Sequence, residues 1–336
     1  MAHWGLGGAQ VTPIGRGLIN ETYLVAGASE RVVLQRVSRI FDPAIHANIL
    51  AVTRRLADQG VATPELRSTG DGAACLDLGR DGGVWRVLSY MDGAVFDSLR
   101  SEQAWAAGNL VARFHGALDG LDHRFCGMRV GVHDAQRHLA HLAEALRTHG
   151  EHRLFAVAEA LARELFAAAE ALPPMPSLPQ RICHGDLKAN NVIFEGAAPP
   201  ASNRAVCLVD LDTVGPGSLG YELGDAWRSW CNRAGEDVPE AELDLGIFRA
   251  SLDGYRDGGR RALTDDECRA LLLGPEWVSL NLAVRFCADV LGETYFGWNR
   301  ARFPGRGEHN LVRARGQWSL HRAFVATRSD RALCFG

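Results

Sequence analysis

Residues 182–194 read ICHGDLKANNVIF, and this stretch decides how the rest of the chain is interpreted. It places Asp186 and Asn191 five residues apart on a polar segment that runs into an apolar strand. A second apolar run leads to Asp210. Transfer of a phosphoryl group needs a carboxylate that deprotonates a hydroxyl, and two oxygen ligands that hold a magnesium ion against the phosphates. This ordered set predicts such chemistry more strongly than one Asp–Asn pair would.

Each side chain of the set is predicted to have its own task. Asp186 is assigned as the base for the acceptor hydroxyl, a role that contributes about 10²–10⁴ in rate. Lys188 is expected to neutralise the phosphoryl group during transfer. Asn191 and Asp210 are hard oxygen ligands that suit Mg²⁺. Asp212 lies on the same strand face as Asp210, and it is assigned either to the metal or to the orientation of the acceptor.

Two nearby residues are expected to be structural. The pattern H-x-D-x-x-x-x-N, followed by an aspartate after an apolar strand, is typical of the protein-kinase-like fold. His184 begins this pattern, and it is expected to hydrogen-bond to backbone near Asp210. Asp225 is expected to cap the loop around Asp186 by accepting its backbone amides. Neither task requires contact with a substrate.

A glycine-containing loop precedes the first clear strands. Glycines allow backbone amides to approach phosphate oxygens closely. The loop matches neither a Walker A motif nor a dinucleotide fingerprint, because no helix follows it closely. We nevertheless expect it to bind the nucleotide phosphates, since it precedes a hairpin far upstream of the Asp–Asn–Asp set. The predicted nucleotide contacts in this loop are Gly15, Gly17, Asn20 and Thr22.

The strand expected at residues 32–37 would carry the phosphate-binding lysine of a protein-kinase-like fold. This chain has Gln35 and Arg36 there. Arg36 is assigned to the phosphates because arginine binds them bidentately; the alternative is an exposed strand arginine. The helix that follows has no acidic residue between positions 42 and 58, so the usual glutamate partner is absent or replaced, with Asn48 as a candidate.

The chain is predicted to have two lobes in an α/β (α+β) fold. Short β-branched runs and one helix indicate a small sheet-rich lobe at residues 1–90, and helical patterns then dominate residues 91–336. Nucleotide is expected in the cleft between the lobes. Ser89 and Met91, where the lobes join, are predicted to lie near the adenine.

Composition limits the possible partners. The chain has 336 residues, 47% of them hydrophobic, and a formal charge of −4, so no global attraction to nucleic acid or anionic membrane is expected. The eight cysteines form no C-x-x-C pair and are interpreted as reduced thiols. There is no signal-peptide pattern and no apolar run of about 18 residues. A cytoplasmic monomer or homodimer is therefore the default expectation.

The motifs resemble those of the aminoglycoside phosphotransferase-like kinases, which include choline, homoserine and sugar kinases. Within that family the series resembles the N-acetylhexosamine 1-kinases. This resemblance implies ATP and Mg²⁺ as cofactors, and direct transfer to the anomeric hydroxyl of N-acetylglucosamine or N-acetylgalactosamine. It also implies that Arg285 and Tyr295 approach the sugar. The motifs are GRGLINETY at 15–23, LQR at 34–36, VDLDTVGPGSL at 209–219, GD at 224–225, RF at 285–286 with Asp289, YF at 295–296, HNL at 309–311 and RAR at 313–315.

Other acceptors remain open from the sequence. Residues 299–336 contain eight arginines and two acidic residues, which disfavours a polycationic acceptor by like-charge repulsion unless these arginines form a solvated helix face. The alternatives are a kinase of the same fold acting on an aminoglycoside, choline, homoserine or another sugar, and a non-catalytic nucleotide-binding regulator. The segment at residues 120–179 matches the family least distinctly, so it is the expected location of substrate differences.

Overall fold

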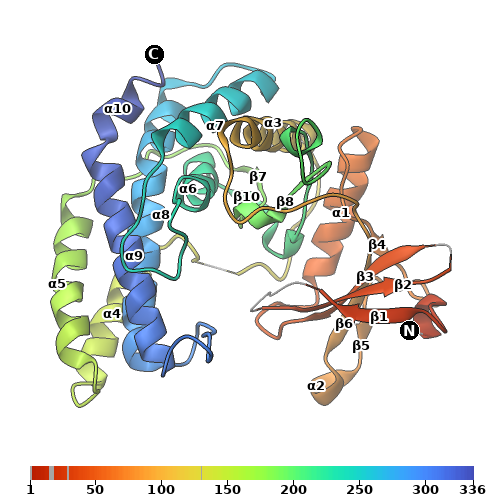
Figure 1. The fold of residues 1–336 in the computed structure, drawn as a ribbon, viewed down its shortest axis with the longest axis horizontal. Helices are drawn as coiled ribbons and strands as arrows, with labels where there is room; N and C mark the ends of the chain where they lie inside the picture. The colour runs from red at the N-terminus through yellow and green to blue at the C-terminus, as the bar shows by residue number, and fades with distance from the viewer. Residues whose placement is uncertain (1, 15–18, 29, 130) are drawn as a thin grey trace.

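An antiparallel sheet forms the N-terminal part of the molecule (Figure 1). The computed structural model describes residues 2–14, 19–28, 30–129 and 131–336. The strand order is β1-β2-β3-β6-β4, and β5 also pairs with β6. The strands are β1 (Gln10–Pro13), β2 (Glu21–Ala26), β3 (Arg31–Val37), β4 (Leu66–Arg67), β5 (Leu76–Asp77) and β6 (Val84–Ser89); the short helices η1 (Ala2–Trp4) and α2 (Gly79–Gly82) accompany them.

The outer face of this sheet is closed by a small apolar cluster. Val32 and Leu34 of β3 pack there with Trp4, Leu6 and Val25, all of them buried. Side chains alternate between the two faces of a strand. Every second residue of β3 after Leu34 therefore also points outward.

The inner face of the sheet carries a polar row. Thr22 of β2 is directly opposite Gln35 of β3, and Gln35 is directly opposite Arg86 of β6. Side chains that are opposite one another across neighbouring strands point to the same face. The register therefore aligns these three side chains on the face that looks toward the rest of the molecule.

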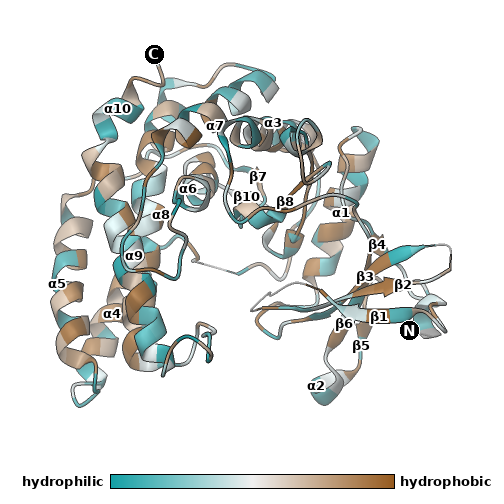
Figure 2. Cartoon of the chain, viewed as in Figure 1, coloured by the Kyte–Doolittle hydropathy of each residue, from teal (hydrophilic) through white to brown (hydrophobic). Residues whose placement is uncertain are grey.

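Helix α1 (Ile45–Asp58) lies between the sheet and the helical part (Figure 1). Ile49, Val52 and Leu56 recur at helical spacing and are buried. They belong to one hydrophobic core with Val37 of β3 and with many residues of the helical part. Figure 2 shows hydrophobic residues on the strands of the sheet and along this helix. The core thus continues from the sheet through α1 into the helices.

Helices make up most of the chain beyond residue 100. The most extensive helix–helix packing joins α3 to α7, α8 to α9, and α6 to α8. Among the described helices, none is long and apolar enough to cross a membrane. The helices are α3 (Ser101–Leu118), α4 (Ala135–Thr148), α5 (Phe155–Ala171), α6 (Leu219–Trp230), α7 (Leu245–Gly258), α8 (Asp265–Gly292), α9 (Arg306–Ala326) and α10 (Arg328–Ala332).

Glycines let α6 and α8 approach each other closely. A Cβ placed on Gly224 of α6 would lie 2.6 Å from the carbonyl carbon of Gly274 in α8. A Cβ on Gly274 would lie 2.0 Å from the carbonyl oxygen of Gly220. Neither distance is possible for a real side chain, so this contact requires glycine. The close packing fixes α6, which carries residues that support the site.

Two short antiparallel strand pairs lie between the sheet and the helices. Strand β8 pairs with β9 in a hairpin, and β7 pairs with β10, which follows that hairpin in the chain. The segments that connect these strands carry the residues that the sequence predicted to be catalytic. Their elements are β7 (Arg181–Cys183), η2 (Ala189–Asn191), β8 (Val192–Phe194), η3 (Ala201–Asn203), β9 (Ala205–Leu208), η4 (Leu211–Thr213) and β10 (Gly215–Gly217).

The segment after β6 joins the sheet to these hairpins. Ala94 pairs with Phe194 of β8 through two backbone hydrogen bonds of 2.8 Å. A Cβ on Gly93 would lie 2.2 Å from the carbonyl oxygen of Phe194, and the φ angle of Gly93 is 151°. The connection is therefore held tightly against β8. The mixed α/β class, with a sheet-rich N-terminal and a helical C-terminal region, agrees with the sequence prediction.

Candidate active site

The loop after β7 is held from below by a buried carboxylate. Glu222 of α6 accepts the amide of His184 at 2.7 Å and the amide of Gly185 at 2.9 Å. This corrects the expectation that Asp225 caps the loop, because Asp225 instead accepts Arg228 Nε at 3.0 Å. Glu222 lies one helical turn before Asp225, so the two share a side of α6. The turn of α6 that carries Glu222 is the one that hydrogen-bonds to the loop.

His184 has the structural role expected of it. Its side chain is fully buried, and Nε2 lies 2.9 Å from the carbonyl oxygen of Val209. Nδ1 accepts the amide of Asp186 at 3.3 Å, so Nε2 carries the proton that is donated to Val209. The imidazole therefore ties the loop of Asp186 to the residue that precedes Asp210.

Asp186 is surrounded by the two partners that its motif supplies. Lys188 Nζ lies 2.8 Å from Asp186 Oδ2. Asn191 Nδ2 donates to the carbonyl oxygen of Asp186 at 2.8 Å and to Oδ2 at 3.3 Å. Burial opposes the charge of Lys188, but Asp186, Asp210 and Asp225 together outweigh it and raise the pKa of Lys188. Asp186, Lys188 and Asn191 are therefore held together by direct contacts.

Asp210 lies beside this group in an uncommon backbone conformation. Its φ and ψ are 69° and 56°, in the left-handed region that a non-glycine residue seldom adopts. Burial, followed by the neighbouring carboxylates of Asp212 and Asp186, raises the pKa of Asp210 to about 6. Several carboxylates this close disfavour one another's charge unless a cation lies between them.

These oxygens fit a divalent metal ion. Asn191 uses its Nδ2 on Asp186, which leaves its Oδ1 as an acceptor. Asp210 provides a carboxylate whose charge is poorly compensated by the protein. Carboxylate and amide oxygens are the ligands that Mg²⁺ takes in nucleotide-dependent enzymes. Asn191 and Asp210 therefore suit the role that the sequence assigned to them.

Asp212 connects the helical part with the sheet. Asn20 Nδ2 donates to Asp212 Oδ2 at 2.8 Å, and Arg86 Nη1 lies 2.5 Å from Asp212 Oδ1. The side chains of Arg86 and Asp212 are each only 2% exposed. Arg86 Nε also donates to Gln35 Oε1 at 2.9 Å. A buried ion pair thus joins β6 to η4 directly after Asp210 in the chain.

Arg36, the predicted phosphate contact, does not lie beside the Arg86–Asp212 pair. Its Nη1 donates to Glu21 Oε1 at 3.0 Å, and its Nη2 donates to the carbonyl oxygen of Asp81 at 3.1 Å. Both partners lie along the outer side of the sheet, because Arg36 alternates with Gln35. Arg86 occupies the inner face instead, and the sequence analysis missed it. One signal was available: Arg86 is the only charged residue of strand β6.

His46, rather than Asn48, is the polar residue of α1 that lies near this site. Asn48 Nδ2 donates to the carbonyl oxygen of Cys126 at 2.7 Å, so it supports a distant loop. His46 is buried, and its Nδ1 lies 2.8 Å from the carbonyl oxygen of Pro43. Burial lowers its pKa, and the charges of Arg86 and Asp212 also act on it. The imidazole therefore belongs to the surroundings of the Arg86–Asp212 pair.

His46 Nε2 is a buried polar atom that has no hydrogen-bond partner among the described residues. Arg86 Nη1 and Asp212 Oδ1, by contrast, are 2.5 Å apart and satisfy each other as an ion pair. Buried polar atoms in folded proteins are almost always hydrogen-bonded, to protein or to bound ligands and water. The unpartnered Nε2 of His46 is therefore consistent with a polar ligand near the Arg86–Asp212 pair.

Two of the other predicted nucleotide contacts lie on the inner side of the sheet. Asn20 reaches Asp212, and Thr22 Oγ1 accepts Gln35 Nε2 at 3.2 Å on the inner face. Gly15 and Gly17 lie outside the described residues. Ser89 is directly opposite Val32, so its side chain points to the outer face, and its Oγ accepts the amide of Glu65 at 2.9 Å. Met91 is half-buried in the connection between the sheet and β8.

The predicted acceptor contacts meet each other on the helical side. Arg285 of α8 donates from Nη2 to Tyr295 Oη at 3.4 Å. Asp289 positions the turn after α8 by accepting the amides of Tyr295 and Phe296 at 3.0 and 2.8 Å. A second arginine, Arg129, also donates to Tyr295 Oη. The sequence analysis did not identify Arg129, which comes from the weakly matching segment at 120–179.

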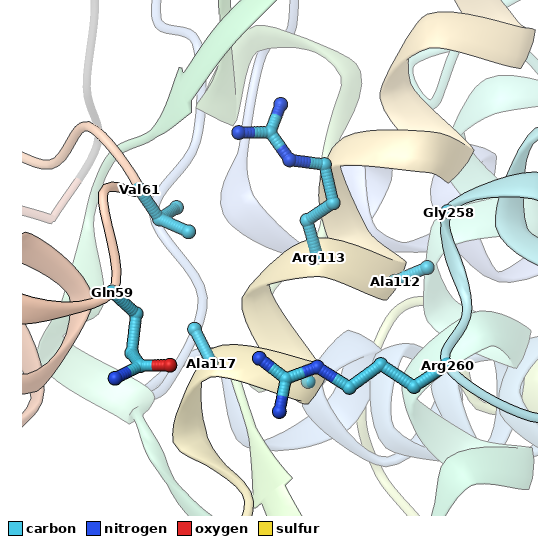
Figure 3. A pocket seen from close by; sticks show the side chains of 8 residues that line it. Gln59, Val61, Ala112, Arg113, Ala117, Gly258 and Arg260 are labelled. Atoms are coloured by element: carbon cyan, nitrogen blue, oxygen red, sulfur yellow. The ribbon is translucent and has the colours of Figure 1, made fainter.

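One surface pocket lies apart from these residues. It has a volume of about 120 Å³ and is bounded by the ends of α1, α3 and α7 (Figure 3). Gln59, Arg113 and Arg260 are among its lining residues, and all three are exposed. None of the predicted site residues lines it, so it is not a candidate active site.

Comparison with known proteins identifies relatives of this chain. Residues 10–262 match the family model described as the phosphotransferase enzyme family. A homoserine kinase from Beijerinckia indica subsp. indica is 26% identical over 243 residues, which represent 72% of this chain and 68% of that protein. The sequence match therefore extends over most of both chains.

Solved structures share the fold. A microcompartment-associated aminopropanol kinase has a TM-score of 0.63 at 18% identity, and the match covers 97% of this chain and 96% of that one. An amicoumacin kinase in complex with AMP-PNP and Ca²⁺ has a TM-score of 0.58 at 13% identity, over 94% of this chain and 88% of that one. At such identities the likeness establishes the fold alone, and it confirms the predicted protein-kinase-like fold.

Proposed function

The chain belongs to the phosphotransferase enzyme family, and we propose that it is an ATP- and Mg²⁺-dependent small-molecule kinase that acts on an N-acetylhexosamine. The phosphorylated atom in this proposal is the anomeric hydroxyl oxygen of N-acetylglucosamine or N-acetylgalactosamine. Residues 1–90 form the nucleotide-binding lobe, and residues 91–336 form the catalytic and acceptor-binding lobe.

The arrangement around Asp186 is the observation that carries the proposal. Its carboxylate lies within hydrogen-bond distance of both Lys188 and Asn191, and its charge acts on Asp210. The residues proposed as base, as cation and as metal ligands are therefore neighbours, which supports the proposal. This combination is what phosphoryl transfer requires, because the reaction depends on positioning and on compensation of phosphate charge. A non-catalytic regulator has no need for the complete set.

Each residue has a defined step in the proposed mechanism. Asp186 accepts the proton of the acceptor hydroxyl as its oxygen attacks phosphorus. Lys188 is ion-paired with Asp186 before the reaction, and it stabilises the negative charge of the phosphoryl oxygens during transfer. Magnesium, when bound by Asn191 and Asp210, supplies charge compensation to the phosphates. Transfer is direct.

Arg86, rather than Arg36, is proposed as the arginine that serves the nucleotide phosphates. It is fixed on the inner face by Gln35 and by Asp212, so its guanidinium is already oriented before nucleotide arrives. A planar guanidinium can bind Asp212 through one edge and a phosphate through another. Asn20 and Thr22 border the same face. The AMP-PNP in the related amicoumacin kinase structure supports ATP as the nucleotide.

The acceptor assignment is supported by the sugar-side residues. Arg285 and Tyr295, which are separate in the sequence motifs, contact each other in the structure. Their surroundings contain no carboxylate ion pair to Arg285 within the described chain. A polycationic aminoglycoside would require acidic residues at this place. A neutral amide-bearing sugar is compatible with it.

A panel of acceptors tests this proposal. Purified protein with ATP and Mg²⁺ is assayed for ADP release with N-acetylglucosamine, N-acetylgalactosamine, glucosamine, homoserine, aminopropanol, choline and kanamycin. We expect one of the two N-acetylhexosamines to give the highest kcat/KM, and phosphorus-coupled NMR to place the phosphate on the anomeric oxygen. A higher kcat/KM for homoserine or for an antibiotic would overturn the acceptor assignment.

A further inference from the structure

Tyr295 lies between two guanidinium groups that come from distant parts of the chain. Arg129 and Arg285 both donate to its phenol oxygen. Their guanidinium carbons lie 5.7 and 5.6 Å from the centre of its ring. A phenol hydroxyl can both accept and donate a hydrogen bond. Because the arginines can only donate, they use the oxygen of Tyr295 as an acceptor and leave its hydroxyl proton available to a ligand.

The two arginines lack compensating carboxylates. Neither forms an ion pair with an acidic residue of the described chain, whereas the other cluster of charges near Asp186 is closely paired. Asp225 is the nearby carboxylate that acts on Arg285, but its Oδ1 accepts Arg228 Nε at 3.0 Å. Burial lowers the pKa of Arg285, and the charge of Arg129 lowers it further against the opposite effect of Tyr295. Among the described residues, the pair of like charges thus has no carboxylate in direct contact with it.

The segment that supplies Arg129 is anchored to the site. His133 stacks on Tyr221 of α6 with a centroid distance of 4.5 Å and an interplanar angle of 4°. Met128 lies against β10, where a Cβ on Gly215 would come within 2.1 Å of its Cε. Arg129 is therefore placed by contacts with the two elements that follow Asp210 and Asp212 in the chain.

Helix α6 connects the arginine pair with the loop of Asp186. Glu222 of α6 accepts the amides of His184 and Gly185 in that loop. The preceding residue, Tyr221, stacks on His133 of the segment that supplies Arg129. Asp225, one turn further along α6, acts on the pKa values of both Lys188 and Arg285. The pair and the proposed base are therefore supported by the same helix.

We propose that Arg129 and Arg285 form a subsite that selects acceptors by charge, by binding a carbonyl or carboxylate oxygen of the acceptor and rejecting an ammonium group at that position. This assignment rests on the proposed function, in which the acceptor oxygen that the two arginines bind is the N-acyl carbonyl oxygen of the hexosamine. Arg129 is the residue that determines this specificity, because it adds the second positive charge and the second donor. Acceptors such as aminopropanol or glucosamine would place a positive charge against two guanidinium groups, which is unfavourable.

The inference is tested with a matched pair of acceptors and a matched pair of variants. N-acetylglucosamine and glucosamine differ at one nitrogen, and below about pH 7 the free amine carries a proton. Arg129→Met removes the charge and the donors while it retains an extended side chain. Arg124→Met changes an exposed arginine of the same segment and serves as the control. Circular dichroism melting confirms that both variants are folded.

We expect wild-type protein to prefer the N-acetyl compound over glucosamine by about a hundredfold in kcat/KM. Arg129→Met should narrow that preference by about tenfold to a hundredfold, the range for loss of a hydrogen bond from a charged group. Arg124→Met should leave it unchanged. An unchanged preference in Arg129→Met would overturn the inference.

Titration calorimetry, with ADP and Mg²⁺ present, separates this inference from the proposed function. If hexosamines are not phosphorylated but neutral or anionic alcohols bind better than their ammonium analogues, and Arg129→Met removes that difference, then the proposed function fails and the subsite stands. If an ammonium-bearing alcohol binds best, or if no neutral or anionic member binds, the subsite is wrong.

Discussion

The two sides of the site differ in the sign of the charge that the protein leaves uncompensated. On the nucleotide side, Asp186 and Asp212 together raise the pKa of Asp210 further than burial alone, against the opposite effect of Lys188 and Arg86. On the acceptor side, Arg129 and Arg285 contact one tyrosine, and neither has an ion-paired carboxylate among the described residues.

The sign of the uncompensated charge on each side indicates which kind of ligand that side binds. Unpaired buried charges are unfavourable in the free protein and become favourable when a ligand of opposite sign or matching dipole binds. The nucleotide side therefore suits a divalent cation with its phosphates. The acceptor side suits an uncharged or anionic oxygen. Changes that alter only one side should affect only the corresponding ligand.

The largest effect is expected from the catalytic base. Asp186→Asn retains the shape of the side chain but cannot accept a proton, so kcat should fall by about 10²–10⁴, or roughly 3–5 kcal/mol of transition-state stabilisation. Steady-state assays of ADP release measure this loss. Asp58→Asn changes an exposed acid of α1 and should leave kcat unaltered. Turnover near the wild-type level in Asp186→Asn would remove the residue from its role.

The next effect compares two arginines on neighbouring strands. Arg86→Met leaves the carboxylate of Asp212 buried without its ion-pair partner, and it should reduce the free energy of unfolding by about 3–5 kcal/mol. Arg36→Met breaks an exposed pair on the outer face, and it should change stability by less than about 1 kcal/mol. Urea denaturation monitors both.

The same two variants distinguish their roles toward ATP. The KM for ATP should rise in Arg86→Met and remain unchanged in Arg36→Met. Because Arg86→Met is expected to be destabilised, Arg86→Lys provides a folded comparison that keeps the charge but loses the planar guanidinium. If Arg36→Met raises the KM for ATP as much as Arg86→Lys does, the assignment of the phosphates to the inner-face arginine is wrong.

A stabilising change is expected at the metal side. Asp210→Asn removes a carboxylate whose pKa is raised to about 6. The folded protein binds the proton of Asp210 more tightly than the unfolded chain does, so the charged form destabilises the fold increasingly as pH rises toward 6 and fully above it. At neutral pH the variant without ligands should gain on the order of 2 kcal/mol, since each pKa unit corresponds to about 1.4 kcal/mol.

Thermal melting over a range of pH measures this gain. It should disappear in acid below about pH 4, near the ordinary pKa of an aspartate, where both states carry the proton. Mg²⁺ with ATP should raise the Tm of wild-type protein but not that of Asp210→Asn. A Tm for Asp210→Asn below that of wild type at neutral pH would contradict this assignment of charge.

The smallest effect is expected at His46. Its Nε2 has no hydrogen-bond partner among the described residues, so His46→Leu should leave the free energy of unfolding within about 1 kcal/mol of wild type. If Nε2 contributes to the ligand environment of Arg86, the KM for ATP should rise by up to about tenfold. An unaltered KM would show that the imidazole only fills space.

The sequence predicts best where the chain itself brings the residues together. Asp186 and Asn191 share one loop, and Asp210 closely follows the second strand of the next hairpin, so little folding beyond local structure is needed to place them. The arginine of the sheet was misplaced because the face of a strand depends on its register, and a shift of one residue exchanges the two faces. Gln35 and Arg36 illustrate this directly.

Residues contributed from a distance were the hardest to predict. Arg129 reaches Tyr295 from 166 positions away, and no spacing in the sequence indicates such a contact. Glu222 was overlooked in favour of Asp225 because both acids lie on the same helix, and only the packed structure determines which turn faces the loop. Helices and strands were easier, since hydrophobic periodicity reports the core directly.

The anchoring of α1 affects how this protein can be regulated. Arg55 of α1 donates to the carbonyl oxygens of Ala117 and Asp119 at 3.0 and 3.2 Å, and Asn48 holds the segment at Cys126. Rotating the helix away from α3 would break these bonds and expose Ile49 and Val52 to water. Because an outward swing of this helix would cost these hydrogen bonds and buried apolar contacts, we do not expect the protein to be controlled by such a movement.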